Sequence, residues 1–268
     1  MYSEKSDFEV HDQEIDRFLT QARAYGVSIR PDSLILDVGG NLGMHAWKLL
    51  PFCKRLYVTD VNRYSSIYDG HLVHLVAEKH ERNNRPFDLA KVVFVESDAQ
   101  DQIFRNGFFD VVLSINAFEH IPDPAKALYE IIRVSKPDAL IYLEFDPLWN
   151  SPGGGHFESY VGEPWAHLLC PAMDYKAKMR SAGASEQEIN DFPGAMNRHT
   201  LNSFRGLFRS VQESRLVRVL EISTWPASFR EEARSSHPNF QKLLAKGYSE
   251  EDLVVRGVRF IAIRTAKA

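Results

Sequence analysis

The sequence predicts an α/β fold with a doubly wound, mostly parallel sheet. Short apolar runs typical of strands alternate with stretches of helical periodicity through the first half of the chain. A glycine-rich turn at residues 39–43 directly follows the first strand and opens a helix. The second strand ends at Asp60, at about the spacing of a ribose-binding carboxylate in a strand–helix–strand unit. These features favour a nucleotide-like ligand at the carboxyl edge of the sheet.

The elements are expected in a regular order. An amphipathic helix over residues 8–24 comes first, because its apolar residues recur at helical spacing, and Pro31-Asp32 breaks that pattern. The near-continuous apolar run at 109–115 suits a strand covered on both faces. The expected strands cover residues 35–38, 55–59, 92–96, 109–115, 139–145, 216–222 and 257–265.

Helix starts are marked by capping residues. Asp123-Pro124 opens a helix that Lys136-Pro137-Asp138 stops, because Asp caps a helix and Pro fits its first position. Thr200 caps another helix, and the run from Ser249 to Asp252 is typical of a helix start. The remaining expected helices lie around residues 43–50, 69–81, 175–189 and 240–246.

Composition excludes several classes of protein. The chain has 268 residues, a net charge of -4 and 44% hydrophobic residues, which is ordinary for a globular enzyme or binding protein. We expect no nucleic-acid or membrane partner, because the chain lacks a basic balance and a long apolar run. Cys53 and Cys170 are too few for a disulfide framework or a zinc site. Residues 1–30 lack the apolar core of a signal peptide, so we expect a cytoplasmic protein.

Residues 146–196 differ from the rest of the chain. They are rich in Pro, Gly, Trp, Tyr and His, and their periodicity fades except around 175–189. A long irregular segment within a compact domain is usually a lid or a specificity loop. We therefore expect a single domain over 1–268, with an N-terminal helical cover at 1–30 and a substrate or lid insertion at 146–199.

The glycine turn does not fit two common phosphate sites. A dinucleotide fingerprint starting at Gly39 would need glycine at the positions of Asn41 and Met44. No Gly-Lys-Ser or Gly-Lys-Thr is present, so a phosphate-cradling loop is excluded as well. What remains is an acidic residue followed by alternating small residues, from Asp37 to Gly43.

At these residues the chain resembles the class I S-adenosylmethionine-dependent methyltransferases. The resemblance covers most of the length and rests on five ordered motifs. They are Asp37 to Gly43, Asp60, Ser97-Asp98-Ala99, Phe109 to Asp123, and Arg133 to Pro137. It implies a Rossmann-like sheet of seven strands, with the seventh strand inserted antiparallel. The chain departs from the family pattern at Asn41, where glycine is usual, although Asn tolerates a left-handed backbone. It departs again at Asp138-Ala139, where two glycines are common.

The resemblance implies S-adenosyl-L-methionine as cofactor, with S-adenosyl-L-homocysteine as product. Asp60 would accept hydrogen bonds from the ribose hydroxyls, and Asp98 from the adenine amine. The backbone at 39–43 would approach the amino-acid end, while Asn116 and Ala117 would face the reactive methyl. The complete set of implied cofactor-binding residues is Asp37, Gly39, Gly40, Asn41, Gly43, Asp60, Val61, Asp98, Ala99, Asn116 and Ala117.

The methyl acceptor is expected to be a small molecule. Transfer from a sulfonium depends mainly on alignment, and a base is needed only when the acceptor must lose a proton, as a hydroxyl does. The candidate bases are His120, His156 and His167. The segment 146–169 resembles a subset of methyltransferases found with bacterial glycan and natural-product pathways. Its composition suits a sugar-like or polyhydroxylated substrate, with Trp149, Tyr160, Trp165 and Arg198 as candidate contacts.

Other interpretations stay open. Nitrogen or carbon methylation would need no essential histidine, and a non-catalytic cofactor-binding protein could keep the same fold. Each of the histidines and aromatic residues named for the acceptor could instead serve packing. His71, His74 and His80 favour a solvated helix face over a metal site, and we expect no metal. The sequence does not indicate the acceptor or the oligomeric state.

Overall fold

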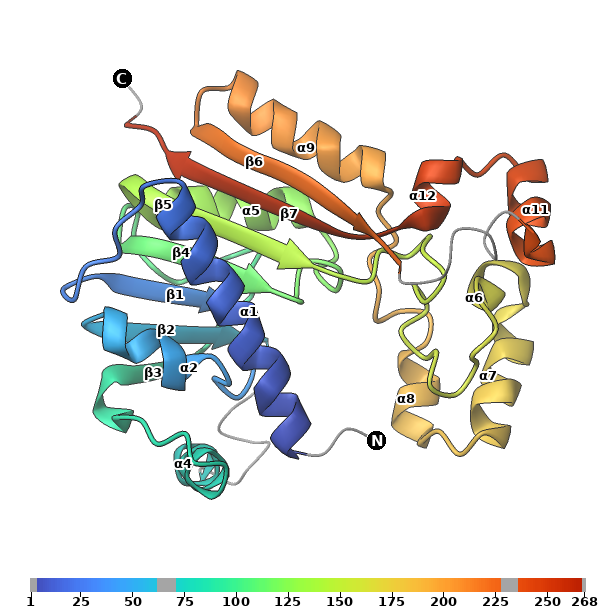
Figure 1. Cartoon of the computed structure of the whole chain (residues 1–268), viewed down its shortest axis with the longest axis horizontal. Coiled ribbons are helices and arrows are strands. Elements are labelled where there is room, and N and C mark those ends of the chain that lie inside the picture. Colours follow the sequence, from blue (N-terminus) through green and yellow to red (C-terminus); the bar gives the residue numbers. More distant parts are fainter. Residues whose placement is uncertain (1–3, 62–70, 228–235, 267–268) are drawn as a thin grey trace.

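A single seven-stranded sheet organises the molecule (Figure 1). The computed structural model describes residues 4–61, 71–227 and 236–266. The strand order is β3-β2-β1-β4-β5-β7-β6. The first five strands pair in parallel, and β7 runs antiparallel to both β5 and β6. The predicted doubly wound, mostly parallel sheet is confirmed, including the antiparallel seventh strand.

The strands lie close to their predicted positions. The bounds are β1 Leu34–Val38, β2 Arg55–Asp60, β3 Val92–Glu96, β4 Phe109–Ile115, β5 Ser135–Phe145, β6 Val217–Pro226 and β7 Val255–Arg264. The prediction is wrong at the start of β5, which begins at Ser135 rather than Ala139. Ser135 already pairs with Phe109, and the register then shifts before Leu140 pairs with Val111. The residues between them belong to an irregular strand rather than to a turn.

Helices cover both faces of the sheet (Figure 1). One face packs against α1 and α2, which supply Ile15, Phe18 and Leu49 to a buried cluster. The opposite face packs against α5 and α9, through residues such as Ile131 and Phe208. The bounds of these four helices are α1 Glu4–Ala24, α2 Ala46–Leu49, α5 Pro124–Val134 and α9 Leu201–Glu213. The same part of the chain also contains α4 Leu72–Arg82 and the 3-10 turns η1 Leu50–Phe52 and η2 Leu89–Lys91.

Capping follows the sequence signals. The side chain of Asp123 accepts a hydrogen bond from the backbone of Lys126, with Pro124 in the first turn of α5. The side chain of Thr200 caps α9 in the same way through Ser203. The predicted helix at 69–81 is α4, and the part of that prediction before residue 71 lies outside the described residues.

After β5 the chain leaves the sheet and builds a smaller lobe (Figure 1). The lobe contains α6 Ala166–Leu169, α7 Ala172–Ser181 and α8 Glu186–Asp191, together with α11 Pro238–Ala245 and α12 Glu250–Val254. The expected single helix around 175–189 is two helices, because Gly183 takes a left-handed φ of 89° and Ser185 starts a new helix with a capping box. The lobe has its own apolar cluster around Tyr175, Met179 and Phe192. None of the described helices is long and apolar enough to cross a membrane.

Candidate active site

A cavity of about 640 Å³ opens at the carboxyl edge of the sheet. This volume lies within the roughly 300–1,000 Å³ of ordinary small-molecule sites. Its walls come from the ends of β1, β2, β3 and β4, and from α1. The lining residues are His11, Val38, Gly39, Gly40, Asn41, Met44, His45, Asp60, Val61, Ser97, Asp98, Ala99, Gln100, Ile115, Asn116, Ala117, His120, Ile121 and Pro122. Nine of the eleven residues implied for cofactor binding are therefore brought together, the exceptions being Asp37 and Gly43.

The glycine turn leaves backbone exposed to this cavity because no side chain fits there. Gly39 has a φ of 75°, and a Cβ on it would lie 2.4 Å from the Cβ of Ala117. Only glycine at position 39 allows the ends of β1 and β4 to approach this closely, because a side chain there would clash with Ala117. Asn41 takes a positive φ of 43°, so it occupies the usual glycine position with a left-handed backbone. The departure from the family pattern at Asn41 keeps the shape of the turn.

Two carboxylates stand at the same rim of the cavity. Asp60 ends β2 and its Oδ2 accepts a hydrogen bond from the backbone of Asn41 at 3.2 Å. Asp98 follows β3, and its Oδ1 accepts one from the backbone of Gln100 at 2.8 Å. Apolar side chains such as Val38 and Ala99 line the same cavity. The carboxylate acceptors at the rim match the ribose hydroxyls of S-adenosylmethionine. The apolar side chains match its adenine base, and the bare glycine backbone matches its amino-acid part. The residues present fit that cofactor.

A buried polar network lies behind the glycine turn, and the sequence analysis missed it. Asp37 accepts a hydrogen bond from His45 Nδ1 at 2.8 Å, and His45 Nε2 donates to Glu14 of α1 at 3.1 Å. Glu14 also accepts hydrogen bonds from His11 Nδ1 and from Asn116 Nδ2, both at 2.7 Å. The network ties α1 to the ends of β1 and β4. The sequence signal for this network was Glu14, a carboxylate on the apolar face of α1.

The charges in this network support one another. Burial alone would lower the pKa of His45, but the adjacent Asp37 and Glu14 carboxylates raise it to about 10. Burial would raise the pKa of Glu14, but hydrogen bonds from His11 and His45 lower it to about 2. At neutral pH a histidinium therefore lies between two carboxylates. The carboxylates neutralise this histidinium, so the group behind the glycine turn presents no net positive charge to the cavity.

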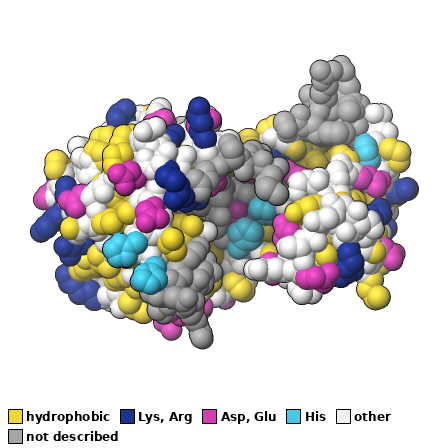
Figure 2. All heavy atoms as spheres, turned by 90° about the horizontal axis from the view of Figure 1, so that it is seen from below, with side chains coloured by type: hydrophobic (Ala, Val, Ile, Leu, Met, Phe, Trp, Pro, Cys, Tyr) yellow, Lys and Arg dark blue, Asp and Glu magenta, His cyan; other side chains and the backbone are white. Residues whose placement is uncertain are grey.

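A second histidine–carboxylate group, Glu119, His120 and His156, lies where the insertion meets the sheet edge. Glu119 is 1% exposed, and burial followed by the like charges of Asp146 and Glu14 raises its pKa well above the ordinary range. The rings of His120 and His156 are 5.1 Å apart. Although the His156 side chain is exposed, partial desolvation of its ring and the neighbouring His120 lower its pKa. Figure 2 shows histidine and acidic side chains gathered in the hollow between the two lobes.

The structure does not bring the other candidate acceptor contacts to the cavity. His167 is buried, its Nε2 lies 2.7 Å from the carbonyl oxygen of Trp149, and burial lowers its pKa to about 4. Trp165 is fully buried and donates to the carbonyl of Leu253 at 2.9 Å. Tyr160 donates to Glu188 at 2.9 Å. His167 and Trp165 thus lie in the interior of the smaller lobe, and Tyr160 is partly buried at its surface.

Two further candidates, Trp149 and Arg198, contact each other within the insertion. The guanidinium of Arg198 lies over the ring of Trp149, 5.1 Å from its centroid. Asn197 donates to the carbonyl oxygens of Phe118 and Ile121, which fixes the end of the insertion to the loop after β4. The insertion and the candidate base His120 are thereby held in one position relative to each other.

Of the eight described residues other than glycine with a positive φ, three lie in the insertion. His156, Trp165 and Arg198 take φ values of 66°, 58° and 60°. Such conformations cost about 1–3 kcal/mol each for residues other than glycine and are typical of functional sites. Surrounding contacts must maintain them. All three were candidates for the acceptor side, and of these Trp165 is fully buried.

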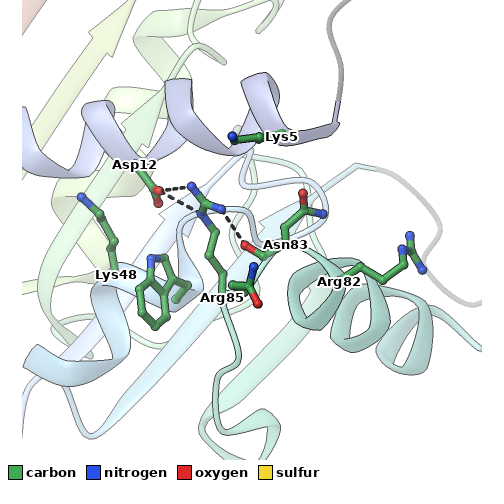
Figure 3. Close-up of a pocket in the computed structure, with 8 residues that line it drawn as sticks. Lys5, Asp12, Lys48, Arg82, Asn83 and Arg85 are labelled. Atoms are coloured by element: carbon green, nitrogen blue, oxygen red, sulfur yellow. Dashed lines mark hydrogen bonds and ion pairs between the residues drawn. The ribbon is translucent and has the colours of Figure 1, made fainter.

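A separate cavity of about 470 Å³ lies away from the sheet edge, between α1, α2 and the end of α4 (Figure 3). Arg85 crosses it and donates two hydrogen bonds to Asp12, at 2.8 and 2.6 Å. None of the predicted site residues lines it.

The prediction of a solvated histidine face is wrong for His80. Its side chain is 1% exposed and packs against the rings of Phe8 and Phe87, because α1 covers it.

Comparison with known proteins shows similarity to methyltransferases. Residues 36–143 match the family model described as a methyltransferase domain. An uncharacterized methyltransferase from Mycobacterium sp. (strain JLS) is 30% identical over 162 residues, which are 57% of this chain and 58% of that relative. The chain thus spans less than two thirds of the relative's length.

Solved structures share the fold at low sequence identity. A methyltransferase from Methanosarcina mazei has a TM-score of 0.54 and 17% identity, covering 90% of this chain and 96% of its own. Magnesium protoporphyrin IX methyltransferase from Synechocystis PCC 6803, solved with bound SAH, has a TM-score of 0.51 and 14% identity, covering 97% and 86%. At these identities the similarity shows the fold alone.

Proposed function

We propose that this chain, which belongs to the class I S-adenosylmethionine-dependent methyltransferases, methylates an oxygen of a sugar-like or polyhydroxylated small molecule. The cofactor supplies an electrophilic methyl group on its sulfonium. The observation that carries the proposal is the position of His120, which lines the cavity with Asp60 and Asp98 and lies beside His156 of the insertion. One cavity therefore joins the cofactor residues to groups that can accept a proton.

On the cofactor side, each residue has a binding role. Asp60 is suited to accept hydrogen bonds from two vicinal hydroxyls, and Asp98 from an amine. The histidinium of His45 lies behind the turn, where it balances Asp37 and Glu14. The role of Asp37 is therefore to orient the turn through His45, because its side chain is buried beneath the cavity floor.

On the acceptor side, His120 and His156 are the candidate bases. The Nδ1 of His120 lies 2.7 Å from the carbonyl oxygen of Ala195, which can only accept, so Nδ1 carries a hydrogen and the lone pair of the neutral ring is on Nε2. His156 has a lowered pKa and is neutral at physiological pH. Both rings can thus receive the proton that a hydroxyl acceptor loses.

The test combines cofactor binding with turnover. Calorimetry with S-adenosylmethionine and with S-adenosylhomocysteine should show binding to the unmodified protein. A panel of sugars and polyols should yield an O-methylated product, detected by mass spectrometry. His156→Ala should keep the cofactor affinity and lose roughly 10²–10⁴-fold in turnover, the usual contribution of a general base. His74→Ala, on an exposed face of α4, is the matched control.

Each alternative has its own outcome. Unchanged turnover in His156→Ala with a nitrogen- or carbon-methylated product would replace oxygen by another acceptor atom. Cofactor binding without turnover on any acceptor would support a binding protein. Absence of cofactor binding would overturn the proposal as a whole.

A further inference from the structure

Glu119 is a buried carboxylate without a partner. It is 1% exposed, and neither of its oxygens has a hydrogen-bond partner among the described residues. The Nε2 of His120 lies 3.8 Å from Glu119 Oε1, which is too long for a hydrogen bond. Burying an unsatisfied carboxyl group is destabilising, and such a group in a native protein is commonly explained by a bound water, a ligand or an ion. The side chain therefore points to a missing partner.

Two histidines face this carboxylate from different parts of the chain. Glu119 and His120 follow β4, whereas His156 comes from the insertion. One ligand atom from each of the three residues lies within 4.8 Å of the other two. Ligand atoms around a zinc-type ion at about 2.0–2.2 Å are separated by roughly 3–3.5 Å in tetrahedral geometry. Small side-chain rotations would bring the three groups to that separation.

The orientation of His120 also suits a metal ligand. Its Nδ1 donates to the carbonyl oxygen of Ala195 at 2.7 Å, so the lone pair of Nε2 is directed toward the Glu119 side. A metal-binding histidine almost always donates its other ring nitrogen in this way, which fixes the tautomer and ring orientation. The contact also ties the insertion to the loop that carries Glu119.

We propose that Glu119, His120 and His156 bind one divalent first-row transition-metal ion, such as Zn²⁺, beside the cofactor cavity. Two imidazoles and one carboxylate form a ligand set of catalytic zinc sites, which keep a further coordination position open. Mg²⁺ and Ca²⁺ prefer sites made of oxygen ligands. Because His120 lines the cavity, the open position is available to an acceptor hydroxyl.

A second group of similar composition does not need an ion. His11, Glu14 and His45 also bring three ligand atoms within 4.8 Å of one another. However, Glu14 accepts hydrogen bonds from both histidines, at 2.7 and 3.1 Å, and both nitrogens of His45 are engaged. An ion there would have to displace an ion pair that is already complete. The partnerless carboxylate distinguishes the proposed site.

The role of the ion rests on the proposed function, whereas its binding does not. A bound transition metal lowers the pKa of a coordinated hydroxyl, which then releases its proton to solvent at neutral pH. The histidines would then act on the acceptor through the ion. Metal binding and cofactor binding can therefore be tested separately.

The test measures metal binding by the full chain. The protein is stripped with a chelator and titrated with Co²⁺, whose absorption reports coordination, and Zn²⁺ affinity is measured by competition with a chromogenic chelator. We expect one ion per chain. Glu119→Gln and His156→Ala should each weaken binding at least 10-fold, and His74→Ala should bind as the unmodified protein does. Circular dichroism shows whether each variant folds.

Two outcomes would overturn the proposal. One is absence of stoichiometric binding at micromolar metal. The other is binding that survives both Glu119→Gln and His156→Ala but is lost in His11→Ala, which would assign the ion to the other group. Calorimetry with S-adenosylhomocysteine on the same stripped protein keeps the two proposals apart. If cofactor binds and metal does not, only the metal site fails, and the reverse result removes the proposed function alone.

Discussion

Two buried glutamates at the same edge of the sheet behave in opposite ways. Glu14 is 2% exposed and Glu119 is 1% exposed. Glu14 accepts hydrogen bonds from His11, His45 and Asn116, and the two histidines hold its pKa at about 2 against the effect of burial. Glu119 has no such partner, and burial raises its pKa. Because the two side chains are almost equally buried, the difference between their pKa shifts comes from their hydrogen-bond partners.

The contrast separates the two sides of the cavity. On the cofactor side, the polar groups behind the glycine turn are largely satisfied by one another before any ligand arrives. On the acceptor side, the group around Glu119 is incomplete within the described residues. We infer that the cofactor side is pre-organised, whereas the acceptor side depends on what binds there.

The largest effect is expected from removing the charge of Glu14. Glu14→Gln should lower the free energy of unfolding by about 3–5 kcal/mol, because it breaks a buried ion pair and leaves His45 with one carboxylate. Urea unfolding at pH 6 measures the change. A loss below about 1 kcal/mol would show that the network contributes little, and the comparison with Glu119 would then fail.

The pH dependence of stability should show the same network. The pKa of His45 is raised from 6.5 to about 10, so its contribution is complete below pH 6.5 and is lost as the pH rises toward 10. The pKa of Glu14 is lowered from 4.5 to about 2, so its contribution is lost as the pH falls from 4.5 toward 2. The network should therefore be most stabilising between about pH 4.5 and 6.5.

The size of this effect follows from the shift. Between pH 6.5 and pH 9 the His45 contribution should fall by roughly 3 kcal/mol, at about 1.4 kcal/mol per pKa unit. The measurement is the difference in unfolding free energy between the unmodified protein and His45→Gln at several pH values. A difference that stays constant from pH 6.5 to pH 9 would mean that His45 is neutral.

A smaller effect is expected at the rim of the cofactor side. Asp60→Asn removes the charge that strengthens hydrogen bonds to hydroxyls, so it should weaken S-adenosylhomocysteine binding by about 1.5–3 kcal/mol, or roughly 10- to 150-fold. Calorimetry measures the affinity. Asp101→Asn, a substitution outside the cavity lining, is the control. Equal affinities for Asp60→Asn and the control would remove Asp60 from the proposed site.

The smallest effect should have the opposite sign. With chelator present, Glu119→Gln should raise the free energy of unfolding by about 1–2 kcal/mol, because burial disfavours the charged form of Glu119 and raises its pKa, whereas the amide carries no charge. Urea unfolding measures it beside Glu14→Gln. Destabilisation of Glu119→Gln by more than about 1 kcal/mol would indicate an ionised, partnered carboxylate.

The sequence predicts the sheet well because its signals are local. Apolar runs mark the strands, and Asp123, Thr200 and Ser249 each cap the helix that follows them. The short helices α6, α7 and α8 carry weak signals because the cluster around Tyr175 and Phe192, rather than an apolar stripe on each helix, holds them together. Local periodicity does not report such packing.

The site is predictable only in part for the same reason. Asp60 and Asp98 follow strands, so the parallel sheet brings them to one rim. The Glu14–His45 contact joins residues 31 positions apart on different elements, and nothing near either residue indicates the other. Glu119 appears in a motif, but its burial depends on how the insertion packs. His167 and Trp165 resemble pocket residues in composition and lie in the interior instead.

The left-handed backbone of the insertion has a consequence for engineering. Glycine at 156 or 198 would relax a conformation that His156 and Arg198 adopt with φ near 60°. Selection for heat resistance alone would therefore favour glycine at these positions. The same exchanges would remove an imidazole from the rim and a guanidinium from above Trp149. Thermal stability and the proposed substrate contacts would thus compete at these two positions.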